Sequence, residues 1–220
     1  HDFPAKIDGN MATADTINFN VPKENFMGVA TSWDNAESAD GLKDIADAQK
    51  KITAKGLHKP MYAIMEKAKV EQLYAQKATA KRLFPRADQA LVTADMINLE
   101  AVNKYMKGKG WPQILVLDAY ATIENAKGEP DTFKPWNENV VTLSPTPQLG
   151  WTYYKPVPMV KDTEALQSHA KYYKITRYSE LNPMLEVTMA EGYIQPGLIN
   201  RRSLVFINTA NTTWAKGEKA

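Results

Sequence analysis

The chain has 220 residues, of which 44% are hydrophobic and 24% are charged, so it can bury a sizeable core and is not a disordered tail. Lysine and arginine exceed aspartate and glutamate by only two (27 against 25), without a long block of one sign, so no nucleic-acid or membrane surface is indicated. The lack of cysteine excludes a disulfide framework, a thiolate zinc site and a cysteine nucleophile. No apolar stretch approaches the ~18 to 20 residues of a membrane span.

The first third predicts one short strand and one helix. Residues Thr16–Val21 alternate apolar and polar side chains, which is typical of a half-buried strand, and Pro22 ends it. After Asp40, apolar residues recur at helical spacing, and lysines gather before Gly56. This pattern predicts a helix from Asp40 to Gly56, because it has a capping aspartate at its start, basic residues in its last turn and a glycine after them.

The middle of the chain alternates strands with helices. Residues Pro60–Met65 predict a short buried strand, and a second helix follows from Val70 to about Ala80, with a break at Phe84 and Pro85. A third helix is expected after Thr93, ending at Gly108 or Gly110.

The stretch from Trp111 to Tyr154 predicts the main sheet. The run Ile114–Leu117 is uninterrupted and rich in branched side chains, which favours a central strand buried on both faces. A polar loop over Asn125–Asp131 separates it from Asn139–Leu143, whose alternation predicts a strand that returns to the same sheet as a long hairpin.

The last third is rich in strands and prolines. The pattern of residues Lys161–Tyr173 is compatible with either a polar helix or a lid-like loop. Residues Ile175–Ser179 predict a strand. Two further strands are expected at 183–190 and 203–209. Residues 193–202 connect them, and Pro196 and Gly197 are expected to turn this connection. The tail after Trp214 is expected to be frayed. Together the elements predict a mixed α+β fold in two parts.

Candidate catalytic and metal-binding residues are sparse. The three histidines are far apart, so His58 and His169 are interpreted as structural or surface residues. Asp44 and Asp47 share a helix face and could hold a cation, but solvated carboxylates are far commoner there. Asp118 follows a strand without a base, nucleophile or cofactor motif. The five tryptophans are better explained as core and interface anchors than as the lining of a ligand groove.

An ordered series of loose motifs resembles the family of lambda-type phage major capsid proteins, called major capsid protein E. The series runs from about Phe19 to Thr209, and its order is more specific than any one motif. Its members are Trp33, Asp40–Ile45, the lysine-rich helix to Gly56, the Pro60 strand, Gln113–Tyr120, Gly128, Phe133–Trp136, Asn139–Leu143, Leu149–Trp151, Glu186–Ala190, Pro196 and Ser203–Asn208.

The resemblance implies an HK-ninety-seven-type shell fold. It assigns residues 33–160 to an axial domain, and residues 1–32 and 161–220 to parts of a peripheral domain. The family's N-terminal arm, extended loop and spine helix would precede residue 1. If so, Thr16–Val21 should pair with the C-terminal strands.

The function that the resemblance implies is structural: many copies tile an icosahedral shell that encloses DNA without sequence-specific binding. Pentameric and hexameric capsomers are the expected homo-oligomers, with decoration, scaffold and portal proteins as possible partners, and with no catalysis, cofactor, metal or membrane. The expected location is the virion, and the host cytoplasm during assembly. Candidate subunit contacts lie on a hairpin between Ala126 and Trp136 and are Lys127, Glu129, Phe133 and Trp136.

Two other interpretations stay open. The first is the shell of an encapsulin-like compartment with the same fold. The second is a small-molecule-binding α/β domain or enzyme, which would use Asp118 and the aromatic residues of Trp151–Tyr154.

Overall fold

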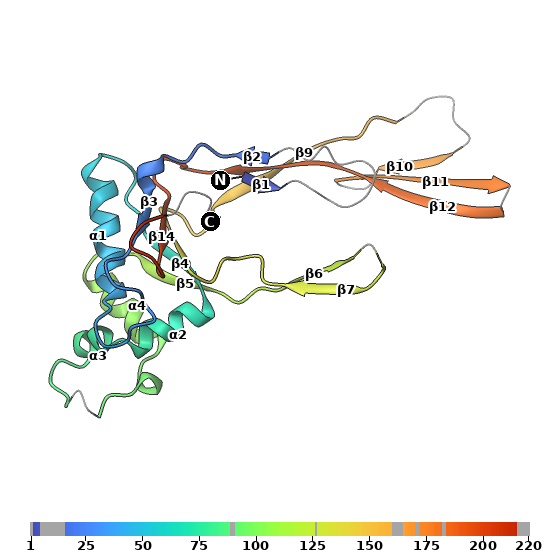
Figure 1. The fold of residues 1–220 in the computed structure, drawn as a ribbon. Coiled ribbons are helices and arrows are strands. Elements are labelled where there is room, and N and C mark those ends of the chain that lie inside the picture. Colours follow the sequence, from blue (N-terminus) through green and yellow to red (C-terminus); the bar gives the residue numbers. More distant parts are fainter. Residues whose placement is uncertain are drawn as a thin grey trace. The chain divides into compact units, whose positions relative to one another are not determined.

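The computed structural model describes residues 2–4, 16–88, 91–125, 127–159, 165–169, 172–181 and 184–214. The chain forms two compact units: His1–Leu149 with Asn200–Ala220 make the first, and Gly150–Ile199 make the second. All helices of the described part belong to the first unit (Figure 1). None of them is long and apolar enough to cross a membrane. The mixed α+β class is confirmed.

A mixed five-stranded sheet forms the centre of the first unit. β14 lies between β3, to which it is parallel, and β8, to which it is antiparallel, and β4 joins β8 to the parallel strand β5. All five residues of β8 are buried, and successive side chains point to opposite faces, so both faces are covered there. In sheet order the strands are β3 (Phe26–Gly28), β14 (Val205–Asn208), β8 (Val140–Ser144), β4 (Tyr62–Glu66) and β5 (Gln113–Leu117).

The prediction that Ile114–Leu117 forms a central strand is wrong, because β5 is an edge strand. Ile114 is buried, but Val116 is 37% exposed. A short apolar run also suits an edge strand that is covered on one face, so the run alone could not identify the centre. The strand expected at Asn139–Leu143 does return to the same sheet as β8, but β4 lies between it and β5.

Helix α1 (Gly41–Ala54) confirms the helix expected between Asp40 and Gly56. The Asp40 side chain accepts the N–H of Lys43 at 3.1 Å, which caps the first turn. Gly56 has a φ of +71°, the left-handed conformation that glycine adopts at little cost after a helix. The helix packs on β14, and its fully buried side chains are Leu42, Ile45 and Ile52.

The second predicted helix is two helices, α2 (Lys67–Ala75) and α3 (Lys77–Leu83). Gln76 separates them with an extended backbone, and its buried side-chain Oε1 accepts the N–H of Gly41 at 2.8 Å. A contact with the start of α1 therefore interrupts the helix. The predicted break at Phe84 is confirmed, since α3 ends at Leu83.

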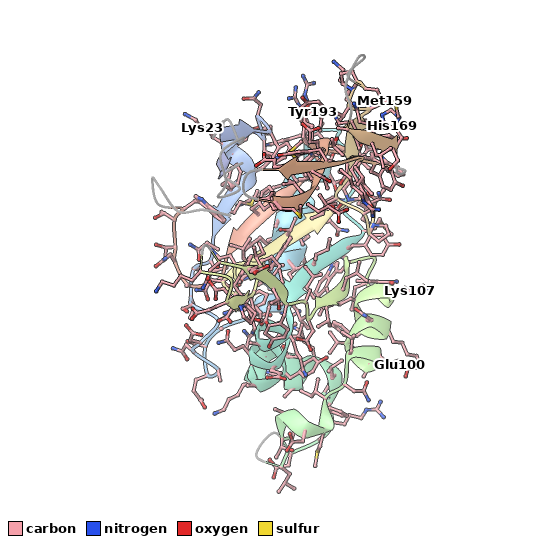
Figure 2. The ribbon with its side chains drawn as sticks, turned by 90° about the vertical axis from the view of Figure 1, so that its right-hand side faces the viewer. Lys23, Glu100, Lys107, Met159, His169 and Tyr193 are labelled. Carbon is pink, nitrogen blue, oxygen red and sulfur yellow. The ribbon has the colours of Figure 1, made fainter. Side chains whose placement is uncertain are left out.

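Helix α4 (Leu99–Gly108) begins later than Thr93, because Asn98 is its cap and accepts the N–H of Ala101 at 2.8 Å. A short 3-10 turn at Ala94–Met96 precedes it. Glu100 and Lys107 are exposed on its surface (Figure 2). The predicted end at Gly108 is confirmed.

The predicted pairing of Thr16–Val21 with the C-terminal strands is wrong. The short strand β2 (Thr16–Asn18) pairs with β1 (Asp2–Pro4), while β14 joins the main sheet. Three of the four residues of β14 are buried, and they point to both faces, which favours an interior position. The side chain of Asn25, next to β3, donates to Leu204 O at 2.8 Å and so holds the start of β14 beside it.

The second unit consists of strands alone among its described residues. One sheet pairs β9 (Gly150–Lys155) with β13 (Tyr193–Leu198), and the other has the order β10-β11-β12. The last three are antiparallel and span β10 (Leu166–His169), β11 (Lys174–Leu181) and β12 (Met184–Glu191).

The last third of the chain contains the predicted strands but differs at the predicted turn. The strands expected at 175–179 and 183–190 are confirmed as β11 and β12. Within 161–173 the described part contains strand β10 and no helix, and residues 161–164, 170 and 171 lie outside it. The prediction that Pro196 turns the chain is wrong, because Pro196 lies within strand β13. Both strands of a two-stranded sheet are edge strands, and an edge strand tolerates proline, which has no backbone N–H to donate. The tail beyond Trp214 also lies outside the described residues.

A further hairpin, β6 (Ala121–Glu124) with β7 (Pro130–Phe133), projects from the connection between β5 and β8 in the first unit. The division into axial and peripheral domains at residues 32/33 and 160/161 stays a prediction. The compact units have boundaries of their own, at 149/150 and 199/200.

Candidate subunit-contact surfaces

The tip of the β6–β7 hairpin is ordered by the side chain of Asn125. Its Oδ1 accepts the backbone N–H of Lys127 at 2.9 Å and that of Glu129 at 3.1 Å, and Gly128 has a φ of +79°. The backbone N–H of Asn125 donates to Glu129 O at 2.8 Å. The tip therefore presents Lys127 and Glu129, both exposed, from a defined turn.

The base of the hairpin is attached to the main sheet by an ion pair. Lys134 Nζ lies 2.6 Å from Oε1 of Glu66, the last residue of β4, and 3.2 Å from Oε1 of Glu138. Glu66 is only 4% exposed, and its Oε2 accepts the N–H of Ala68 at 2.7 Å, capping α2. Lys134 Nζ also lies 5.6 Å from the centroid of the Tyr120 ring.

This contact shifts both pKa values. The hydrogen bond from Lys134 lowers the pKa of Glu66, against the opposing effect of its burial, and the Ala68 N–H lowers it further. The hydrogen bonds to Glu66 and Glu138 raise the pKa of Lys134. Both groups are therefore charged near neutral pH, and the hairpin is held to the end of β4 by opposite charges.

The structure places the four candidate contact residues in two kinds of position. Lys127, Glu129 and Phe133 are all exposed on the hairpin, Phe133 at 43%, but Lys127 and Glu129 lie at its tip and Phe133 at its base. Trp136 is half-buried, and its Nε1–H donates to Val140 O at 3.1 Å. It is held by packing at the hairpin base. The contacts themselves stay a prediction.

A cleft of about 320 Å³ lies at the carboxyl ends of the parallel strands β4 and β5, where α/β proteins often bind ligands. Its polar side chains, Glu66 and Lys134, bind each other. Asp118 is not among its lining residues and instead lies 3.6 Å from Lys67. The other lining residues are Ile64, Leu117, Ala119, Pro135, Trp136, Pro147 and Leu149.

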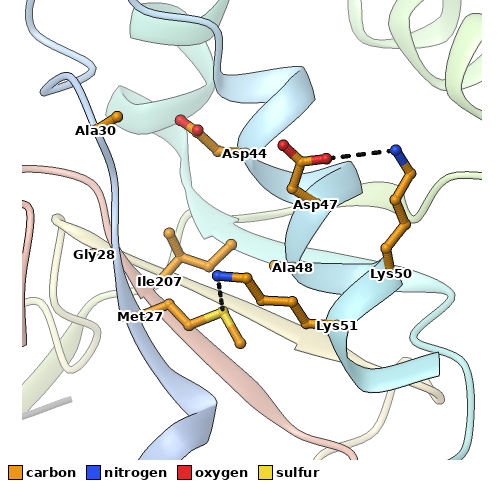
Figure 3. A pocket seen from close by; sticks show the side chains of 9 residues that line it. All are labelled: Met27, Gly28, Ala30, Asp44, Asp47, Ala48, Lys50, Lys51 and Ile207. Atoms are coloured by element: carbon orange, nitrogen blue, oxygen red, sulfur yellow. Dashed lines mark hydrogen bonds and ion pairs between the residues drawn. The ribbon is translucent and has the colours of Figure 1, made fainter. Parts of the chain in front are cut away.

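A second hollow, of about 400 Å³, lies between β3 and α1 (Figure 3). Asp44 Oδ2 accepts the Nε1–H of Trp33 at 2.9 Å, and Asp47 Oδ1 lies 3.5 Å from Lys50 Nζ. Burial raises the pKa of Asp44, partly offset by the Trp33 hydrogen bond. The two carboxylates thus bind different protein partners. Among the described residues no group of three His, Asp or Glu side chains could hold a metal ion.

The sequence matches no protein-family model and no curated protein. The fold is similar to the crystal structure of a phage-related protein from Bordetella bronchiseptica. The TM-score is 0.50, with 14% identity over 84% of this chain and 56% of that protein. The chain shares the fold of a phage-related protein. It spans little more than half of that protein's length.

Most of the exposed large hydrophobic side chains lie in the second unit, and of these the sequence predictions singled out only the aromatic residues of Trp151–Tyr154 as candidate site residues. Of twenty large hydrophobic side chains that are exposed among the described residues, thirteen lie in the second unit. Ten of these are tyrosine, tryptophan or methionine, for example Trp151, which is 57% exposed. Tyr193, at 58%, and Met159, at 47%, are two others (Figure 2). These residue types are enriched at the centres of protein interfaces. Their alternation along β9 and β12 was visible in the sequence, but it did not show that the described residues of the same unit leave them exposed.

The two histidines agree with a structural or surface role. His169 Nε2 lies 2.8 Å from Val157 O within the second unit. His58 is exposed in the connection between α1 and β4.

Proposed function

We propose that this chain is the structural subunit of a shell of the phage-head type, with an HK-ninety-seven-like fold, and that it acts as a major capsid protein. The observation that carries the proposal is the fold shared with a phage-related protein over 84% of the chain. The order of the sequence motifs supports it independently. In this proposal many copies enclose DNA in the virion, and assembly takes place in the host cytoplasm.

The surface chemistry suits such a role. A shell needs contacts that close by rotation into rings, built from modest patches with aromatic anchors and polar rims. The β6–β7 hairpin offers exposed groups of both kinds, with the aromatic Phe133 at its base and the charged Lys127 and Glu129 at its tip. The near-neutral balance of 27 basic against 25 acidic residues suits a shell that confines DNA without gripping it.

The ligand-binding alternative has less support. The cleft beside Trp136 has the right position for a ligand site, but its buried carboxylate already binds Lys134 and caps α2. Asp118 is exposed and paired with Lys67 outside that cleft. The proposed role requires no catalytic group, so we infer that the chain is not an enzyme.

Self-assembly tests the proposal. We expect the purified chain to form discrete rings or closed particles as its concentration rises, measured by sedimentation velocity and by negative-stain electron microscopy. A chain that stays monomeric or dimeric at every concentration and salt condition would overturn the proposal.

The hairpin contact is tested by Phe133→Ser. We expect this change to weaken assembly about tenfold, because truncating an interface anchor costs ~1–2 kcal/mol. The matched control is Met96→Ser, which removes a side chain that is 58% exposed outside the hairpin and should leave assembly unchanged. Equal effects of the two changes would show that the hairpin is not the contact.

A further inference from the structure

The second unit has almost no core of its own. Among its described residues only Val157, Lys174 and Thr176 are buried, while thirteen large hydrophobic side chains are exposed. Small antiparallel sheets need a covering layer or a further strand for stability. The unit therefore has the properties of a surface that is completed by a partner.

Strand β12 is an edge of its sheet, and apart from two glutamates it lacks the usual protection of an edge strand. Among the described strands it pairs only with β11, over all eight of its residues. It contains no proline and no lysine, which commonly keep edge strands from pairing with other chains. The opposite edge, β10, has only four residues.

One face of β12 is apolar. Leu185, Val187 and Met189 alternate along the strand and so point to the same face, and Tyr178 of β11 lies directly opposite Val187 on that face. Leu185 and Tyr178 are each 38% exposed, and Met189 is 36% exposed. An added strand with the same pattern would extend this apolar face.

We propose that β12 is an interface between two copies of this chain, which add their β12 strands to each other antiparallel about a two-fold axis at Val187. The two three-stranded sheets then form one continuous six-stranded sheet. A two-fold axis makes the contact self-complementary, so the same strand supplies both sides.

The residues of β12 suit pairing with themselves. With Val187 on the axis, Leu185 faces the partner's Met189 and Glu186 faces the partner's Thr188, so apolar side chains meet and no like charges do. The described part of the unit carries three basic and three acidic residues, and two copies therefore do not repel each other.

The choice of a second copy as partner rests on the proposed function, which requires self-association. The experiment separates the two. If particles form without β12 pairing, the present inference fails and the shell proposal stands. If β12 pairs but nothing larger than a dimer forms, the shell proposal fails and the inference stands.

Cross-linking tests the pairing directly, because the chain has no cysteine and a single one can be introduced. Directly opposed residues of antiparallel strands have Cα atoms ~4.5–5.5 Å apart, within the range of about 4.4–6.8 Å for a disulfide. We expect mild oxidation of Val187→Cys to give a disulfide-linked dimer. The control is Ser179→Cys on β11, whose two copies would be at least about 14 Å apart, because three strand spacings separate them, and which should stay monomeric.

The inference fails if Val187→Cys cross-links no better than Ser179→Cys. A second pair of variants keeps the test valid if a cysteine disturbs the strand. Val187→Lys places two like charges on the axis and should weaken dimerisation at least tenfold by sedimentation, whereas Ser179→Lys should not. In the wild-type chain, amide hydrogen exchange in β12 should slow as concentration rises, and exchange that does not change with concentration overturns the inference.

Discussion

Replacing Trp33 with alanine should lower the free energy of unfolding of the first unit by about 3–5 kcal/mol. Trp33 is 1% exposed and belongs to the main hydrophobic core. A Cβ added at Gly41 would lie only 2.8 Å from its ring, so the ring packs directly on the start of α1. The change also leaves the half-buried Asp44 without its Nε1–H donor. Urea unfolding followed by far-UV circular dichroism measures the effect.

Trp151→Ala is the matched control for this prediction. Trp151 has the same side chain but is 57% exposed on β9, so its loss should change stability by about 0.5 kcal/mol or less. A Trp33→Ala variant as stable as Trp151→Ala would contradict the assignment of Trp33 to the core.

The second large effect is expected for Glu66→Ala, which should destabilise the first unit by about 2–3 kcal/mol. Loss of a helix cap alone costs about 1 kcal/mol, and loss of the hydrogen bond that the charged Lys134 donates to the buried Glu66 carboxylate adds to this cost. The change removes the cap of α2 and leaves Lys134 without its partner at 2.6 Å. Equilibrium unfolding in urea measures the loss.

Asp118→Ala is the control for Glu66→Ala. The Asp118–Lys67 pair, at 3.6 Å, is exposed on both sides, and exposed pairs contribute at most about 1 kcal/mol. Glu66→Gln separates the two roles of Glu66, because the amide oxygen can still accept the Ala68 N–H while the charge is lost. We expect its stability to fall between those of the wild type and Glu66→Ala.

The ion pair should also make stability depend on pH. The pKa of Glu66 is lowered below its usual 4.5, first by the hydrogen bond from Lys134. A carboxyl with a lowered pKa in the folded state stabilises the fold above its unfolded pKa, and this contribution is lost as pH falls through the folded pKa. The wild type should therefore exceed Glu66→Gln in stability near neutral pH, and the difference should shrink below pH 4.5. A constant difference across the acid range would exclude this role.

The Glu66–Lys134 ion pair should also affect the proposed subunit contacts of the β6–β7 hairpin. Lys134 follows β7 directly, and through Glu66 it connects the hairpin to the end of a buried strand. If the hairpin contacts a neighbouring subunit, Glu66→Gln should weaken assembly without changing any exposed residue of the hairpin itself. The sedimentation experiment used for Phe133→Ser measures this.

The sequence by itself determined the features that depend on neighbouring residues. Asp40 and Gly56 mark both ends of α1, because a cap and a left-handed glycine act within one helical turn. The turn at Asn125–Gly128 was predictable for the same reason, since the Asn125 side chain binds backbone groups two and four residues on.

Only the tertiary structure decided the position of each element and what covers it. β5 became an edge because β4 and β8 occupy the centre, and Gln76 interrupts a helix because its side chain binds Gly41, 35 residues away in sequence. β14 lies inside the main sheet, where both faces are covered, and its buried side chains accordingly point to both faces. Alternation along β12 shows that one face is apolar, but whether a layer covers that face depends on chain segments far away in sequence, or on another molecule.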